Sequence, residues 1–393
     1  MRVALISMVE RIGGEPGSLA RASLAFGGRT IAERQLDFAL AWGAERIICL
    51  AAGLDPKVME LQHAAEAEGA RFNLINGAPS MLGLIAAEDE LLVLADGLLP
   101  LSQRALEMLE QGRTVLLLEA EGGVAAGFER VDLNHAWAGA LAVPGALVER
   151  LGALPPDIEP VSALLRIALQ ARISERLLSE AVLGSGSWSL AGSPEQMAHR
   201  EAAWLGAQLP QVSGFAPGSW LVRGGVTRMG AKLLRRGTRP ALLGIAGGVL
   251  AAGGVVAAWQ EWPILGLLLA GLAWLASEGA GGLRAIARAG IRGKEGAGLP
   301  WTALGWGIDA AFVAILGFAS SYSAPEALFA PLVLFGLLRI APRLVDGTLA
   351  ATLSDRALLA VVLSIAAGAG ALTGAVQVLA LVLLALFLTP FAS

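Results

Sequence analysis

Glu278 and Asp309 are two of the few carboxylates in or beside the apolar runs of the C-terminal part of the sequence. An ionisable side chain in or beside a membrane span is costly, so it is usually functional or paired with an opposite charge. Glu278 and Asp309 are therefore candidates for a functional role, and the alternative is a structural ion pair with Arg284 or Arg288.

A second candidate site follows the first apolar run, VALISM at 3–8. The next segment, ERIGGEPGSLAR, contains Gly13, Gly14 and Gly17, whose backbone N–H groups could bind a phosphate. A plain turn explains the same glycines equally simply, because the chain has 50 of them. Asp96 ends another apolar run, LLVLAD, and precedes a glycine, which is also a common turn pair.

The predicted positions of these residues follow from an alternation of strands and helices in the first 150 residues. We predict strands at 3–8, 46–52, 71–75, 91–96 and 114–119, and helices at 30–43, 55–68, 79–87 and 101–111. This order is typical of βαβ units on a largely parallel sheet, which binds ligands at the carboxyl ends of its strands. The segments 162–183 and 194–209 have helical patterns and are expected to complete a domain over 1–213.

The amino-acid composition of residues 241–393 differs from that of the residues before them. Charged residues make up 16% of the 393 residues and the mean hydropathy is +0.64. Residues 241–393 contain only seven acids and seven bases, so the net charge of −4 belongs to the residues before them. Such apolar content excludes disorder, and a single cysteine, Cys49, excludes a disulfide-stapled fold. The second part is expected to be a membrane domain.

Six apolar runs in this part approach the length that crosses a bilayer. We predict spans at 241–259, 262–277, 301–320, 325–341, 357–371 and 373–390. Arginine and lysine cluster before the first span and in alternate loops, so both termini are expected in the cytoplasm, with the protein in the plasma (inner) membrane. No signal peptide is apparent, since VALISM is too short for one.

Residues 214–240 form the expected connector between the two parts. On a helix, Val222, Val226, Met229 and Leu233 make one apolar stripe, and five basic residues line the other side. Such a helix is predicted to lie at the membrane interface, attracted by anionic lipid. The alternative is a solvated linker.

The run SLAFGGRTIAERQLDFALAWGAERIICLAAG (23–53) resembles the sugar-nucleotidyltransferase family. The resemblance covers about residues 3–150 and implies a Rossmann-like nucleotidyltransferase sheet. It makes Gly13, Gly14 and Gly17 the phosphate loop, and it places Arg21 where the family has a lysine. Asp96 becomes a Mg²⁺ ligand, with the turn role as the alternative.

An interfacial helix followed by six spans resembles the CDP-alcohol phosphatidyltransferase family, in the fused form that carries a nucleotidyltransferase. The family motif is D-x-x-D-G-x-x-A-R followed by G-x-x-x-D-x-x-x-D. The matching segments are LASEGAGGLR (275–284) and GWGIDAAFV (305–313). The four aspartates of this motif bind divalent metals in the family, so the resemblance makes Glu278 and Asp309 candidate metal ligands. Leu275 and Val313 replace the other two aspartates. The resemblance implies Mg²⁺ or Mn²⁺, a CDP-alcohol or CTP, a membrane lipid and a homodimer, with Arg284 and Arg288 as phosphate contacts.

The sequence therefore supports two functions. One is an enzyme of phospholipid or polar-headgroup biosynthesis, a CDP-alcohol phosphotransferase or a nucleotidyltransferase. The alternative is a catalytically degenerate relative, a pseudoenzyme that binds nucleotide or lipid and scaffolds an active partner. The sequence does not decide whether the chain is an enzyme, because two of four motif positions are apolar. Nucleic acid is not an expected partner, since the basic residues cluster at the membrane boundary.

Overall fold

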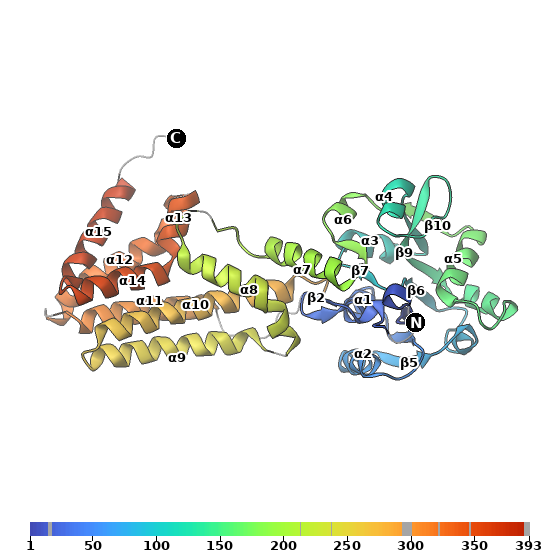
Figure 1. Ribbon diagram of the computed structural model, residues 1–393, viewed down its shortest axis with the longest axis horizontal. Helices are drawn as coiled ribbons and strands as arrows, with labels where there is room; N and C mark the ends of the chain where they lie inside the picture. The colour runs from blue at the N-terminus through green and yellow to red at the C-terminus, as the bar shows by residue number, and fades with distance from the viewer. Residues whose placement is uncertain are drawn as a thin grey trace. The chain divides into compact units, whose positions relative to one another are not determined.

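The first of two compact units contains a seven-stranded sheet (Figure 1). The computed structural model describes residues 1–14, 18–212, 214–236, 238–292, 301–320, 323–345 and 347–388. Unit 1 comprises Met1–Leu205 and Arg288–Gly293, and unit 2 comprises Gly206–Ala287 and Lys294–Ser393. The sheet strands are β1 (Arg2–Ser7), β4 (Arg46–Leu50), β5 (Arg71–Ile75), β6 (Glu90–Leu94), β8 (Thr114–Glu119), β9 (His135–Pro144) and β10 (Ser174–Leu177).

Their order in the sheet is β10-β8-β9-β6-β1-β4-β5, and only β9 runs antiparallel to its neighbours. The predicted α/β class is therefore confirmed, and all five predicted strands exist. The sequence analysis missed β9, whose small and apolar residues gave no helical or alternating pattern. It was also wrong about residues 174–177, predicted as helix: α5 (Pro160–Gln170) ends first, and the chain turns at Arg172 with a φ of 54° into strand β10.

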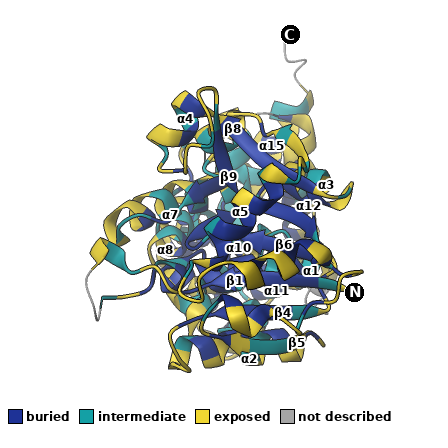
Figure 2. Ribbon diagram, turned by 90° about the vertical axis from the view of Figure 1, so that its right-hand side faces the viewer, coloured by how far each residue is buried: buried dark blue, intermediate teal, exposed yellow. Residues whose placement is uncertain are grey.

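Helices cover both faces of this sheet. The helices α1 (Ile31–Ala41), α2 (Pro56–Ala67) and α3 (Gln103–Glu110) pack against one set of alternate strand residues. The other set packs against α5 and the 3-10 segment Gly145–Ala153. Figure 2 shows the central strands of the sheet as buried and much of α2 as exposed. The predicted helix at 79–87 is wrong, since only a short 3-10 turn, Ala78–Met81, forms there.

A buried amide fixes α1 against the sheet edge where Asp96 lies. The helix starts with a capping box in which Thr30 and Glu33 satisfy each other's backbone N–H groups. One turn later Gln35, with none of its surface exposed, donates its Nε2 protons to the carbonyl oxygens of Ala95 (2.8 Å) and Leu98 (2.9 Å). The backbone on both sides of Asp96 is thus held by one side chain.

Unit 2 is helical and fits a multi-pass membrane protein. Its helices are α8 (Pro217–Arg235), α9 (Pro240–Trp259), α10 (Pro263–Arg288), α11 (Trp301–Phe318), α12 (Ala324–Leu344), α13 (Gly347–Ser354), α14 (Arg356–Gly368) and α15 (Leu372–Leu388). Within the described ranges four of them, α9 to α12, are long and apolar enough to span a membrane. A fifth span is formed if α13 and α14, bent by 61°, count as one.

The sequence predicted six spans, and the difference lies in the last two. Apolar helices do occupy all six predicted positions, but α14 has 13 residues and α15 has 17. Close packing in this unit depends on small residues: a Cβ at Gly254 of α9 would lie 2.8 Å from the carbonyl oxygen of Gly266 in α10. Small residues let membrane helices approach at backbone distance.

The predicted connector helix forms as α8. Val226 of its apolar stripe is buried, together with Gly218, Gly230 and Ala231, and Met229 is 55% exposed. Leu283 and Ile286 of α10 pack on Gly230. Apolar Trp220 and Leu221 are exposed on α8. Binding of this helix to the membrane interface stays a prediction.

We expect Gln35→Leu to lower the free energy of unfolding of the α/β unit by about 2–4 kcal/mol, because two buried carbonyl groups lose their donors. Chemical unfolding of the full-length protein in detergent, followed at α/β-unit tryptophans such as Trp42, measures this loss. The control is Gln103→Leu, the same change at an exposed position of α3. Equal stability of the two variants would contradict the structural role of Gln35.

Candidate functional site

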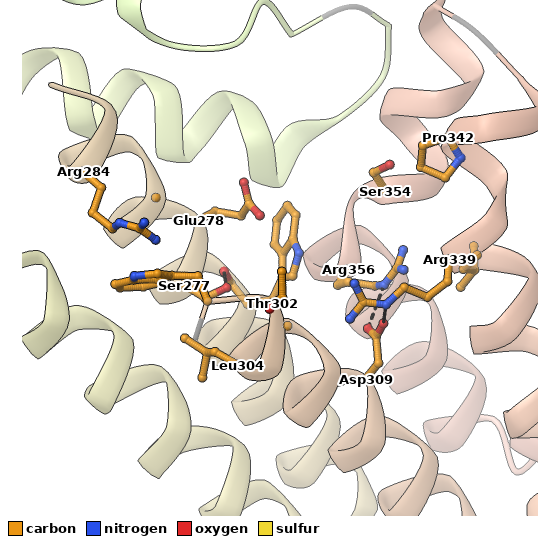
Figure 3. A pocket seen from close by; sticks show the side chains of 15 residues that line it. Ser277, Glu278, Arg284, Thr302, Leu304, Asp309, Arg339, Pro342, Ser354 and Arg356 are labelled. Atoms are coloured by element: carbon orange, nitrogen blue, oxygen red, sulfur yellow. Dashed lines mark hydrogen bonds and ion pairs between the residues drawn. The ribbon is translucent and has the colours of Figure 1, made fainter. Parts of the chain in front are cut away.

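A cavity of about 370 Å³ lies among the membrane helices of unit 2 (Figure 3). Residues of α10, α11, α12 and the α13–α14 junction line it. Its polar and charged side chains are Ser277, Glu278, Arg284, Thr302, Asp309, Arg339, Ser354 and Arg356. The cavity thus joins three of the four residues that the sequence analysis singled out in this part of the chain.

Asp309 is the most constrained of these side chains. It is 7% exposed, and its two carboxylate oxygens face different arginines. Arg356 donates from Nε to Oδ1 at 3.1 Å, and the Nε of Arg339 lies 2.7 Å from Oδ2. Figure 3 shows both guanidinium groups converging on this one carboxylate. Asp309 therefore lies between two cations.

Each of the two arginines is also held by a second contact. Arg356, 6% exposed, donates from Nη1 to the carbonyl oxygen of Leu353 at 2.7 Å. Arg339 stacks on the ring of Trp306, 4.6 Å from its centroid. Its Nε forms an ion pair with Asp309 in a geometry unsuited to a hydrogen bond, and its Nη2 is buried without a hydrogen-bond partner among the described residues. Arg339 therefore keeps donor capacity for a further acceptor.

The other predicted residues of this part differ in their positions. Arg284 lines the cavity and stacks on Trp301 at 4.5 Å from the ring centroid. Glu278 lines it with an exposed side chain. Arg288, at the end of α10, is not among the lining residues. The observed partners of Asp309 are Arg339 and Arg356, whereas the sequence suggested Arg284 or Arg288. Sequence reasoning missed these two arginines because it counted them only as loop charges that orient the spans.

The donor set of the cavity does not fit a divalent cation. Both oxygens of Asp309 face arginines, Leu275 offers no ligand, and Val313 is buried in the helix core. Across the described ranges, no three His, Cys, Asp or Glu side chains are grouped as metal ligands would be. The two guanidinium groups next to the carboxylate would also repel a metal cation.

Asp96 organises the second candidate site, in unit 1. It lies just beyond β6, is 7% exposed, and accepts three hydrogen bonds at Oδ2: from Ser7 Oγ (3.0 Å), Val9 N (2.7 Å) and Glu10 N (2.8 Å). Burial raises the pKa of Asp96 to about 6, although the bonds from Glu10 N, Ser7 Oγ and Val9 N oppose the shift. Its Oδ1 is buried without a hydrogen-bond partner in the part of the chain that the structure describes. Asp96 thus fixes the start of the glycine-containing loop.

The described residues on the two sides of that loop are paired with each other. The N–H of Ile12 donates to the carbonyl oxygen of Leu19, and the N–H of Arg21 donates to the carbonyl oxygen of Glu10. Gly13 and Gly14 have φ of 70° and 72°, and the N–H of Gly14 donates to the carbonyl oxygen of Arg11. The third predicted glycine, Gly17, lies outside the described residues.

Arg21 lies beside Asp96 but has an acidic partner. Its Nη1 pairs with Glu10 Oε2 at 2.7 Å, and its side chain packs on Gly97, where a Cβ would lie 3.0 Å from the Arg21 Cβ. The structure therefore brings Arg21, Glu10 and Asp96 together at the carboxyl ends of β1 and β6. Asp96 Oδ1 offers a single ligand for Mg²⁺, and the described residues supply no ligand cluster around it.

Comparisons with known proteins give a fold likeness only. No protein-family profile and no curated protein matches the chain. Solved structures that resemble it include a protein described as a glucose-1-phosphate thymidylyltransferase of Bacillus anthracis (TM-score 0.42, 11% identity, 52% of this chain and 95% of that chain). Another is UDP-glucose pyrophosphorylase with UDP-glucose (TM-score 0.38, 13% identity, 52% and 98%). At these TM-scores the likeness carries no argument about activity.

We expect Asp96 to make stability depend on pH. Its folded pKa of about 6 lies above the ordinary value of 3.8, so the folded protein binds the proton more tightly than the unfolded chain. Stability therefore falls as the pH rises from about 4 to about 6, by up to about 3 kcal/mol, and then levels off. Unfolding of the α/β unit by denaturant at several pH values measures this slope.

Asp96→Asn should remove that part of the pH dependence, because its side chain does not titrate. Asp157→Asn, at an exposed position, is the control and should leave the profile unchanged. A wild-type slope in the Asp96→Asn protein would show that another group titrates in this range.

Proposed function

We propose that this chain is a membrane protein of polar-headgroup metabolism that binds a phosphate-bearing ligand, a CDP-alcohol or a lipid headgroup, without metal-dependent group transfer. The observation that supports this most directly is the buried carboxylate of Asp309, which faces two arginines. In the resembled family, the matching aspartate is a metal ligand. In this chain Asp309 holds the guanidinium groups of Arg339 and Arg356, and their positive charge favours an anionic ligand.

The charge of the cavity supports an anionic ligand. Three guanidinium groups and two carboxylates line it, so its formal charge is positive. Guanidinium groups bind phosphate oxygens in pairs, and Arg339 retains a buried donor. A volume of about 370 Å³ is within the range of small-molecule sites. A diphosphate or a phospho-alcohol headgroup is therefore the proposed occupant.

The α/β unit is proposed to bind a nucleotide such as CTP at the carboxyl ends of β1 and β6. Open α/β sheets bind ligands at this edge, and Asp96 and Arg21 lie there. The donor set beside Asp96 does not by itself support Mg²⁺ or Mn²⁺ catalysis. We propose a role as a pseudoenzyme that presents nucleotide or headgroup to an active partner. A homodimer and cytoplasmic termini belong to the same proposal.

Asp309→Asn distinguishes anion binding from metal-dependent binding. Removing the negative charge between two arginines should strengthen binding of pyrophosphate by about 1–2 kcal/mol, roughly five- to thirtyfold. If a metal ion held by Asp309 bound the pyrophosphate, Asp309→Asn would instead weaken pyrophosphate binding. Isothermal titration of pyrophosphate, in a phosphate-free maltoside detergent and with or without EDTA, measures the difference.

The matched control is Glu261→Gln, which removes a carboxylate at the far end of the α9–α10 pair and should leave the affinity unchanged. Weaker binding by Asp309→Asn, or a requirement for Mg²⁺ or Mn²⁺ in the wild type, would reject the proposal. Turnover of CTP or a CDP-alcohol by the purified protein would establish the enzyme alternative.

Arg356→Gln should weaken pyrophosphate binding about tenfold or more, because hydrogen bonds to charged groups are the strong ones in such sites. Arg343→Gln is the control, since Arg343 is an exposed arginine of α12 that does not line the cavity. Equal affinities of the two variants would place the binding site elsewhere. Monodisperse elution of both proteins confirms that they are folded.

A further inference from the structure

One buried carboxylate marks the start of two helices in unit 2. Asp355, 1% exposed, accepts a hydrogen bond at Oδ1 from the N–H of Leu358 (3.0 Å) and so caps α14. Its Oδ2 accepts from the N–H groups of Gly218 (2.7 Å) and Ser219 (3.3 Å), in the first turn of α8. Residues 137 positions apart are thereby joined through a single side chain.

Helix α8 has no cap of its own. Its N-cap residue is Ala216, which is buried and has no side-chain acceptor, and Pro217 follows. The first N–H groups of a helix need partners, and an anionic acceptor also matches the positive end of the helix dipole. Asp355 fills both needs from α14.

The approach is close enough to require glycine at one position. A Cβ at Gly218 would lie 2.4 Å from Asp355 Oδ1 and 2.8 Å from the Cβ of Ala357. On its other side α14 meets α10, where a Cβ at Gly271 would lie 2.8 Å from the Cβ of Ala360. The first turns of α14 are thus held between α8 and α10 at backbone distance.

The residue after Asp355 is the arginine of the cavity. Arg356 turns from this junction toward Asp309 and lines the cavity (Figure 3). Asp355 also lies at the break where α13 and α14 meet at an angle of 61°. The direction of the Arg356 side chain therefore depends on the backbone geometry that Asp355 fixes at the break between α13 and α14.

We infer that Asp355 is a positioning residue for the anion-binding cavity: by joining the start of α8 to α14, it sets Arg356 against Asp309. This inference rests on the proposed function and adds to it a residue that has no contact with the ligand. Asp355 acts through Arg356 alone, so its effect on binding depends on that arginine.

A double-mutant cycle tests this dependence in the full-length protein. Asp355→Asn replaces one acceptor oxygen by an amino group that repels the N–H groups around it. It should weaken pyrophosphate binding roughly fivefold or more when Arg356 is present, and less than about twofold in the Arg356→Gln background. Equal losses in both backgrounds, or no loss in either, overturn the inference.

The matched control is Asp55→Asn. Asp55 caps α2 by accepting from the N–H groups of Lys57 and Val58, but it lies in unit 1. This variant loses a helix cap of the same kind and should keep the wild-type affinity. A comparable loss of affinity in Asp55→Asn would show that general destabilisation explains the effect.

Hydrogen exchange gives a readout that does not depend on pyrophosphate. In the wild type the N–H groups of Gly218 and Ser219 are bonded to Asp355, so Asp355→Asn should speed exchange in peptides that cover 217–222 and 353–358. Unchanged exchange in both peptides overturns the inference. If the wild type binds no pyrophosphate, the proposed function fails, and the exchange data still decide whether Asp355 joins the two helix starts.

Discussion

The ion pairs of one buried aspartate with two arginines are the interaction on which the membrane part of this protein depends. Charges removed from water are costly, and their attraction offsets that cost only when each has a well-placed partner. Asp309 has Arg339 and Arg356, and these arginines have Trp306 and a backbone carbonyl as further contacts. Two guanidinium groups face one carboxylate, so the group of three side chains keeps a net positive charge.

Carboxylates in both units organise neighbouring groups. Asp96 holds the backbone after β1, Asp355 holds the starts of two helices, and Asp309 holds two guanidinium groups. Each is nine-tenths or more buried, so each hydrogen bond or ion pair operates in a medium of low polarity. Asp96 lies at the carboxyl ends of the strands, the edge where open α/β sheets bind ligands, and Asp309 is a residue that the sequence analysis predicted as a metal ligand. In both positions the observed partners are hydrogen-bond donors.

Close packing of the helices in unit 2 brings their buried polar groups into contact. Gly254 lets α9 reach α10, and Gly218 and Gly271 let α14 approach α8 and α10. Without a hydrophobic driving force between membrane helices, contact depends on such small residues and on buried polar groups. The glycine excess of the sequence thus has a structural use beyond loops. Gly218 places its backbone N–H within reach of Asp355, and this contact fixes the start of α14, from which Arg356 extends into the cavity.

The sequence alone determined the α/β unit, the apolar helices and the candidate residues Glu278 and Asp309, because local periodicity and hydropathy follow from neighbouring residues. It did not reveal β9 and β10, which form only when a strand adds to an existing sheet. Nor did it find the partners of Asp309, since Arg339 and Arg356 lie 30 and 47 residues away on other helices. Whether an aspartate holds a metal or an arginine depends on which side chains surround it. Only the packing of helices distant in sequence brought two arginines to Asp309.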